Sequence, residues 1–171
     1  MLTDGQVLTG AHMQLVKLNF DETAVAKIVG AGHYVVGAGA NSLVDRQVQQ
    51  SSNSATGTTT STSFTDLTGT TAGPAVTVTT GTAALMWFGC QMQNSLANTA
   101  LQVAYSLNGG TPDSSIDLFI DGLSVAGQAF RASVIHYHTG LTPGSNTFTL
   151  KYKVAAGTGS FYDRVLGSMP F

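Results

Sequence analysis

Apolar and polar side chains alternate along most of the chain beyond residue 64, and turn-forming residues interrupt this alternation at short intervals. Such a pattern is typical of an all-β domain. Counting the runs predicts eight strands, with residues 123–126 as an optional short ninth: near 64–68, 74–80, 84–93, 100–107, 116–121, 129–138, 146–154 and 160–168. Eight short strands favour a jelly-roll-like antiparallel β-sandwich, and an immunoglobulin-like sandwich is the main alternative.

The run 84–93 differs from its neighbours because it is apolar on both faces of the predicted strand. One face suits the interior of a sandwich, whereas a second apolar face needs another chain to cover it. Symmetric association would bury that face without leaving a surface able to grow into a filament. We therefore predict a closed oligomer, with these candidate interface residues: Leu85, Trp87, Phe88 and Met92.

Residues 1–50 lack the regular alternation of the later part of the chain, and they predict an N-terminal arm ahead of the sandwich. Thr9 suits the cap of a short helix that continues to about Asn19 and presents apolar side chains on one broad face. Further on, glycine pairs bracket residues 33–36, which predicts a short strand or hairpin in an otherwise extended arm. Residues 51–63 are nearly all small and polar, so we assign 51–63 as a Ser/Thr-rich linker and 64–171 as the β-sandwich domain.

Composition narrows the classes of partner. Charged residues are only 9% of the chain, the net charge is −2 and the pI is near 6.0. No basic stripe is present to neutralise phosphates, so nucleic acid is a poor candidate partner. The chain has no run of about eighteen consecutive apolar residues, so membrane insertion is not expected. The N-terminus lacks the pattern of a secretory signal peptide. Cys90, the single cysteine, lies in an apolar run and is expected to be a buried, inert thiol.

Few residues suggest chemistry. His136 and His138 would project from one face of a strand about 7 Å apart, but no spacing ties a third metal ligand to them. Asp117 and Asp121 could act as a glycosidase pair, although two carboxylates beside an Asp-Gly turn are more often solvated. The neighbouring Asp163 and Arg164 favour a structural ion pair or a subunit contact.

The glycine-rich stretch Gly30–Gly37 lacks the Gly-Lys-Ser/Thr that a phosphate-binding loop requires. The sequence as a whole predicts a protein that is not an enzyme and has no cofactor or bound metal.

Three stretches resemble modules of virion proteins of tailed bacteriophages. Residues 4–13 resemble the opening of many minor tail and fibre-like proteins. Residues 21–46 are similar to a Gly/Ala-rich element common in phage fibre and appendage proteins. Residues 60–67 and 73–85 look like the start of the β-rich domain that often follows. The resemblance implies a component of the phage particle, and it favours a homotrimer among the closed oligomers.

Three functions are compatible with this resemblance. The first is a tail-associated fibre or knob that docks by its arm and displays the sandwich to a host cell-surface glycan or protein. The second is a head decoration protein that stabilises the lattice of the major capsid protein. The third is a small hydrolase of envelope polymer. Candidate residues for docking to other virion proteins are the apolar side chains of the arm: Leu8, Met13, Leu15, Leu18 and Tyr34.

Overall fold

The computed structural model describes residues 33–37, 43–68, 73–112, 117–120 and 123–171, with side chains described from Arg46 onward. The chain divides into two compact units, Met1–Asp45 and Arg46–Phe171. The first unit contains β1 (His33–Gly37), which pairs with β2 (Leu43–Gln47) in a two-stranded sheet. The short strand or hairpin predicted around 33–36 is therefore confirmed, whereas the predicted helix lies outside the described residues.

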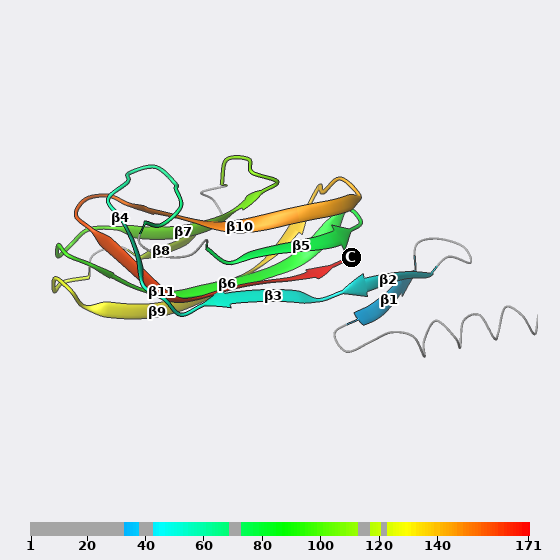
Figure 1. The fold of residues 1–171 in the computed structure, drawn as a ribbon, viewed down its shortest axis with the longest axis horizontal. Helices are drawn as coiled ribbons and strands as arrows, with labels where there is room; N and C mark the ends of the chain where they lie inside the picture. Colours follow the sequence, from blue (N-terminus) through cyan, green and yellow to red (C-terminus); the bar gives the residue numbers. More distant parts are fainter. Residues whose placement is uncertain (1–32, 38–42, 69–72, 113–116, 121–122) are drawn as a thin grey trace, which may run out of the picture. The chain divides into compact units, whose positions relative to one another are not determined.

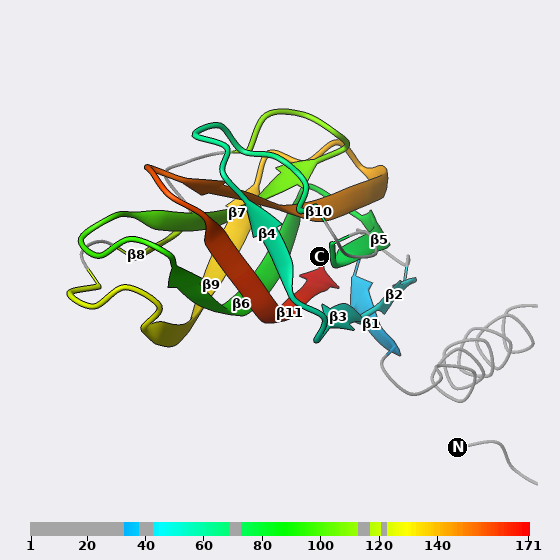
Figure 2. The same cartoon turned by 60° about the vertical axis from the view of Figure 1, so that its left-hand side comes forward.

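The second unit is an antiparallel β-sandwich, which confirms the predicted all-β, jelly-roll-like class. Figures 1 and 2 show its two layers. A four-stranded sheet has the order β5 (Ala75–Thr80), β10 (Gly144–Val154), β7 (Leu101–Leu107), β8 (Leu118–Ile120). The other sheet has the order β3 (Gln49–Asn53), β11 (Gly159–Pro170), β6 (Ala83–Asn94), β9 (Ala129–Thr139), and β4 (Gly57–Thr59) also pairs with β11.

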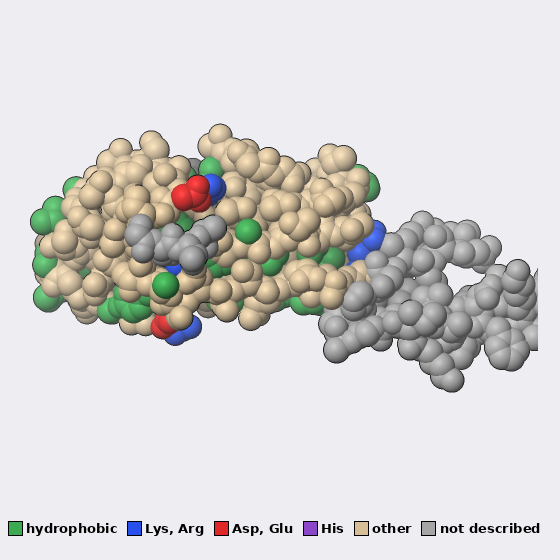
Figure 3. All heavy atoms as spheres, viewed as in Figure 1, with side chains coloured by type: hydrophobic (Ala, Val, Ile, Leu, Met, Phe, Trp, Pro, Cys, Tyr) green, Lys and Arg blue, Asp and Glu red, His purple; other side chains and the backbone are tan. Residues whose placement is uncertain are grey.

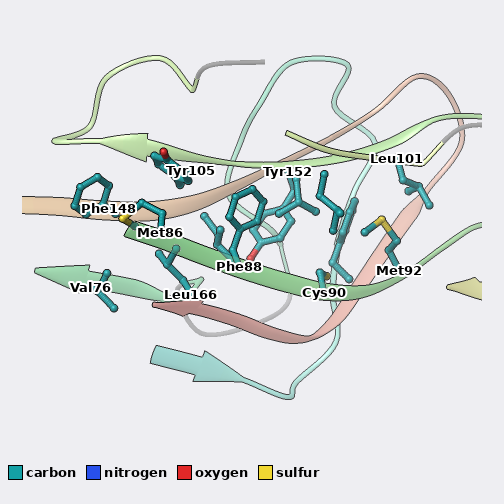
Figure 4. Packing of buried hydrophobic residues seen from close by; sticks show 14 of the residues in the cluster. Val76, Met86, Phe88, Cys90, Met92, Leu101, Tyr105, Phe148, Tyr152 and Leu166 are labelled. Atoms are coloured by element: carbon teal, nitrogen blue, oxygen red, sulfur yellow. The ribbon is translucent and has the colours of Figure 1, made fainter. Parts of the chain in front are cut away.

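Alternation along the strands builds the core between the two sheets. The apolar residues that alternate along β5, β7 and β10 are buried, apart from Leu107, which is partly buried: Val76, Val78, Leu101, Val103, Tyr105, Phe148, Leu150, Tyr152 and Val154. From the other sheet, β6 contributes Met86, Phe88, Cys90 and Met92, all with no exposed surface. Figure 4 shows these side chains meeting those of the opposite layer. Phe88 meets Tyr105 edge-to-face with ring centroids 5.7 Å apart, a favoured aromatic geometry.

The segment 51–63 is part of the sandwich, so its assignment as a linker is corrected. β3 and β4 run one after the other along the same edge of β11, paired with Arg164–Ser168 and Gly159–Phe161 respectively. Composition was misleading here because threonine is a good strand former and β11 offered an unpaired edge. The boundary between the units accordingly lies before Arg46 rather than in the Ser/Thr-rich stretch.

Near residues 64–68 the predicted strand is reduced to two isolated antiparallel bridges, one between Thr65 and Tyr152 and one between Thr68 and Thr58. Just before it, the Ser61 hydroxyl donates to the Ser63 carbonyl at 2.6 Å and accepts from the Ser63 amide at 3.1 Å. Such local side-chain hydrogen bonds compete with a strand ladder. The optional strand at 123–126 is likewise absent, since none of these residues has strand structure.

A bulge in β11 breaks its pairing with β6 between Tyr162 and Val165. Asp163 has a φ of 48°, a left-handed conformation in which aspartate is tolerated better than most residues. The extra residue turns Arg164 toward the interior, where it is only 1% exposed and donates to the Ala55 carbonyl at 2.9 Å. Arg164 thereby joins β11 to the loop between β3 and β4.

No helix among the described residues is both long and apolar enough to cross a membrane.

Candidate interaction surfaces

The side of β6 that faces away from the core is apolar as well, as its sequence predicted. Leu85 and Trp87 lie on this side, opposite Tyr137 and Ile135 of β9 and opposite Met169 and Gly167 of β11. Ile135 is 70% exposed and Tyr137 is 55% exposed. Together with the C-terminal ring, these side chains form what we call the apolar outer face: Leu85, Trp87, Ile135, Tyr137, Val165, Met169 and Phe171.

Trp87 is held flat on this face by its neighbours. A Cβ placed at Gly167 would collide with the indole ring, so only glycine leaves room for Trp87 to lie across β11. The indole nitrogen donates to the Gln50 side chain on β3 at 3.4 Å. On the far side, the Tyr137 and Phe171 rings have centroids 5.9 Å apart. The apolar outer face thus spans β6, β9 and β11, it is bordered by Gln50 of β3, and its side chains are held by packing.

The structure separates the four candidate interface residues. Leu85 and Trp87 lie on the apolar outer face, whereas Phe88 and Met92 point into the core of the same chain with no exposed surface. Sequence reasoning missed the contribution of β9, because Ile135 and Tyr137 alternate with two histidines and do not stand out as an apolar run. Placing the predicted strand 129–138 next to the predicted strand 84–93 in the sheet would have brought Ile135 and Tyr137 beside the apolar run.

The docking candidates of the arm are not tested. Leu8, Met13, Leu15 and Leu18 lie outside the described residues, and Tyr34 lies on β1, whose side chains are not described.

His136 and His138 lie on the inner side of β9 rather than on an open surface. Their ring centroids are 5.9 Å apart, and the Nδ1 atom of His138 is 2.8 Å from the Tyr105 hydroxyl. Tyr105 also packs edge-to-face on Phe148. Among the described residues, no three His, Cys, Asp or Glu side chains are grouped so that they could hold a metal. The two histidines therefore take part in an aromatic cluster at the border of the core.

A small group of ionisable side chains is buried around the bulge of β11. The Cys90 thiol donates to the Tyr162 carbonyl at 3.6 Å, and burial raises its pKa from 9.0 to about 12. The Arg164 guanidinium lies 5.8 Å from the centre of the Tyr152 ring, and burial raises the pKa of that phenol despite the nearby positive charge. The expectation that Cys90 is buried is confirmed, and a protonated, enclosed thiol is a poor nucleophile.

Asp163 and Arg164 do not form the predicted pair with each other. Asp163 lies 3.5 Å from Arg131 of β9 in an ion pair whose side chains are both well exposed, while Arg164 points inward. The bulge sends the two neighbours to opposite sides of the sheet. Asp117 immediately precedes β8, and Asp121 lies outside the described residues, so the suggested carboxylate pair has no described geometry.

The outer side of the four-stranded sheet is polar. Thr77 and Thr147 face outward from β5 and β10 with their hydroxyls 2.8 Å apart, and Lys151 and Lys153 follow on β10. In the view of Figure 3, backbone and uncharged polar side chains (tan) make up most of the described surface, and charged side chains are few. A depression of about 620 Å³ lies on this polar side, lined by Phe64, Asp66, the loop Gly109–Pro112 and both lysines.

No protein family model matches the chain, and no curated protein matches it by sequence. Among solved structures, the viral particle of infectious bursal disease virus is similar with a TM-score of 0.49 and 9% identity, over 79% of this chain and 35% of that one. The VP2 subviral particle of the same virus is similar with a TM-score of 0.45 and 9% identity, over 80% of this chain and 37% of that one. The enzymatically active domain of a bacteriophage CBA120 tailspike is similar with a TM-score of 0.34 and 11% identity, over 71% of this chain and 19% of that one.

This chain spans little more than a third of the viral chains that it resembles. Likenesses this distant describe an arrangement of strands and carry no argument about function.

Proposed function

We propose that this protein is a non-enzymatic structural component of a tailed-phage particle, present as a homotrimer on a tail-associated fibre or knob. The observation that carries the proposal is the order of the phage-like stretches along the chain. The fibre-like element at residues 21–46 ends where the second compact unit begins, at Arg46. An anchoring unit followed by a displayed sandwich is the organisation that this resemblance implies.

The apolar outer face supports self-association of the sandwich. Ile135, Tyr137 and Phe171 are large apolar side chains that remain 38% to 70% exposed in the single chain. A contiguous apolar face on a protein with so few charges would promote aggregation unless another surface covered it. Association about a closed rotation axis buries such a face without open-ended growth, and three copies suit the symmetry of a tail appendage.

A head decoration protein is the second candidate function. In that case the same arm would lie on the capsid and the sandwich trimers would contact neighbouring major capsid proteins. The number of copies per particle distinguishes the two functions. Quantitative mass spectrometry of purified particles should find tens of copies or fewer for an appendage, and hundreds would favour decoration.

Removing the arm tests how the chain is anchored. A chain starting at Arg46 keeps all strands of the sandwich, including β3 and β4, and is expected to fold. If the arm docks, this shortened protein should be missing from particles assembled in its presence, whereas the full chain should be incorporated. Equal incorporation of both would show that the sandwich itself binds the particle.

A small hydrolase remains the third candidate. Incubating the purified full chain with host envelope polymer and measuring released fragments tests it directly. We expect no release above that from a heat-unfolded sample, and sustained release would overturn the non-enzymatic proposal.

A further inference from the structure

The depression on the polar side is built by three segments that are far apart in sequence. β10 supplies Lys151 and Lys153, the segment before the chain enters β5 supplies Phe64 and Asp66, and the turn after β7 supplies Gly109–Pro112. Two of the seven Lys and Arg residues of the chain therefore lie in a single hollow. The other Lys and Arg residues whose side chains the structure describes are Arg46, Arg131 and the buried Arg164.

Asp66 is oriented by Lys151. The lysine ammonium contacts both carboxylate oxygens, at 2.8 and 2.9 Å. The Lys151 side chain is 22% exposed and that of Asp66 is 65% exposed, so the carboxylate still faces solvent. A carboxylate held in this way keeps lone pairs available to accept hydrogen bonds from the hydroxyl groups of a ligand.

Among the described residues that line the hollow, Lys153 adds a positive charge to the Lys151–Asp66 pair. Its ammonium lies 4.5 Å from the centre of the Phe64 ring, a cation–π contact. Among the described residues, no carboxylate lies within ion-pair distance of Lys153. Lys151 is balanced by Asp66, so Lys153 is the lysine available to pair with an acidic ligand.

The opposite wall is rigid. Asn108 and Gly109 have positive φ values of 49° and 76° and form a tight turn closed by the Gly110 amide, which donates to the Leu107 carbonyl at 2.8 Å. The Asn108 side chain accepts from the Thr147 amide at 2.8 Å and donates to the Asn146 side chain at 2.9 Å. A wall fixed in this way favours binding because little conformational freedom is lost when a ligand enters.

We propose that this depression binds a sugar unit that carries an acidic group, within a surface polysaccharide. Lys153 pairs with the acidic group, Asp66 accepts from sugar hydroxyls, and Phe64 packs against the apolar face of the sugar ring. A small inorganic anion fits less well, because it offers no apolar ring face to Phe64 and no sugar hydroxyl groups to Asp66. This inference rests on the proposed function, since a displayed sandwich needs a ligand on its exposed side.

An array of immobilised oligosaccharides tests the proposal with the full-length protein. The array carries uronic acid oligosaccharides, sugar phosphate oligosaccharides and neutral oligosaccharides of matched size, so that its arms distinguish a carboxylate from a phosphate. We expect binding to at least one acidic class and at least about tenfold weaker binding by Lys153→Met, which keeps the aliphatic stem but removes the charge. Phe64→Leu should also weaken binding.

Arg131→Met is the matched control, because it removes one exposed positive charge from the other sheet and should leave binding unchanged. Thermal melting of each variant shows that it is folded. Equal binding by the wild type and Lys153→Met, or binding to no acidic oligosaccharide, would overturn the proposal. Particle imaging separates this outcome from failure of the proposed function: a chain found on particles that binds no acidic glycan refutes only the site.

Discussion

The two sheets of the sandwich use the same alternation but differ in what they place outward. The five-stranded sheet has a tryptophan, leucine, isoleucine, tyrosine and methionine on its outer side. The four-stranded sheet has threonines and two lysines there. Inside, both sheets are largely apolar, and the five-stranded sheet also contributes the buried Arg164. A sheet with two apolar faces needs a packing partner on each face, whereas a sheet with one polar face can leave that face in contact with water.

The difference is the basis on which we propose separate tasks for the two sides of one small domain. The apolar outer face is suited to contact with other copies of the chain, and the polar side with its depression remains open to a ligand. The following substitutions test this division, beginning with the largest expected effect.

Introducing a charge on the apolar outer face should abolish self-association. In Ile135→Lys, a side chain that is 70% exposed in the single chain becomes cationic, so the fold should tolerate it while an interface should not. We expect the association constant to fall on the order of a hundredfold or more. Light scattering should report a single chain for this variant. Thr79→Lys, on the outer side of β5, is the matched control and should keep the wild-type mass; equal masses for both variants would refute the division.

Gly167→Ala should destabilise the five-stranded sheet by about 1 to 3 kcal/mol, because the added methyl group collides with the Trp87 indole. Urea unfolding in the monomeric Ile135→Lys background measures the change in the free energy of unfolding. In the double variant Trp87→Ala/Gly167→Ala the collision is removed, so the two costs should not add. If the two changes in the free energy of unfolding simply add, the position of the Trp87 indole does not depend on the absence of a side chain at Gly167.

Alkaline pH should weaken the sandwich through its buried thiol. Burial raises the pKa of Cys90 from 9.0 to about 12, so above pH 9 the unfolded chain loses a proton that the folded chain retains. Stability conferred by this group is complete below pH 9 and falls as pH rises, by up to about 1.4 kcal/mol per pH unit. The wild type should lose more stability than Cys90→Ala between pH 9 and 10.5, measured by urea midpoints. If the urea midpoints of the wild type and Cys90→Ala fall equally as the pH rises, this mechanism is contradicted.

Asp66→Asn should have the smallest effect on folding, less than about 1 kcal/mol, because the Asp66 side chain is 65% exposed in its ion pair with Lys151. The same substitution removes an acceptor from the proposed sugar site and should reduce binding on the array. A large loss of stability would mean that this polar wall is part of the core rather than a surface available to a ligand. Urea unfolding at low and high salt measures the contribution of the charge.

The pattern of residues alone predicted much of the sandwich. In the strands predicted at 100–107 and 146–154, apolar residues recur at every second position, so their inner faces could be named from the sequence because side chains on a strand alternate with a period of two. The short strand at 33–36 followed from β-prone residues between glycines. Cys90 was expected to be buried because it lies in the most apolar run of the chain.

Tertiary structure decided the features that depend on pairing between distant segments. Both faces of β6 are apolar, so the sequence could not tell that Phe88 and Met92 point inward while Leu85 and Trp87 point outward; the opposing sheet makes that choice. β3 and β4 form because β11 offers them an edge, and the bulge beside Asp163 turns Arg164 inside against the ordinary preference of arginine. The depression joins residues 64–66, 109–112 and 151–153, which meet only once the sheet is assembled. Alternation is a local property of the chain, whereas register, bulges and hollows arise from contacts between residues far apart in sequence, and no local pattern encodes them.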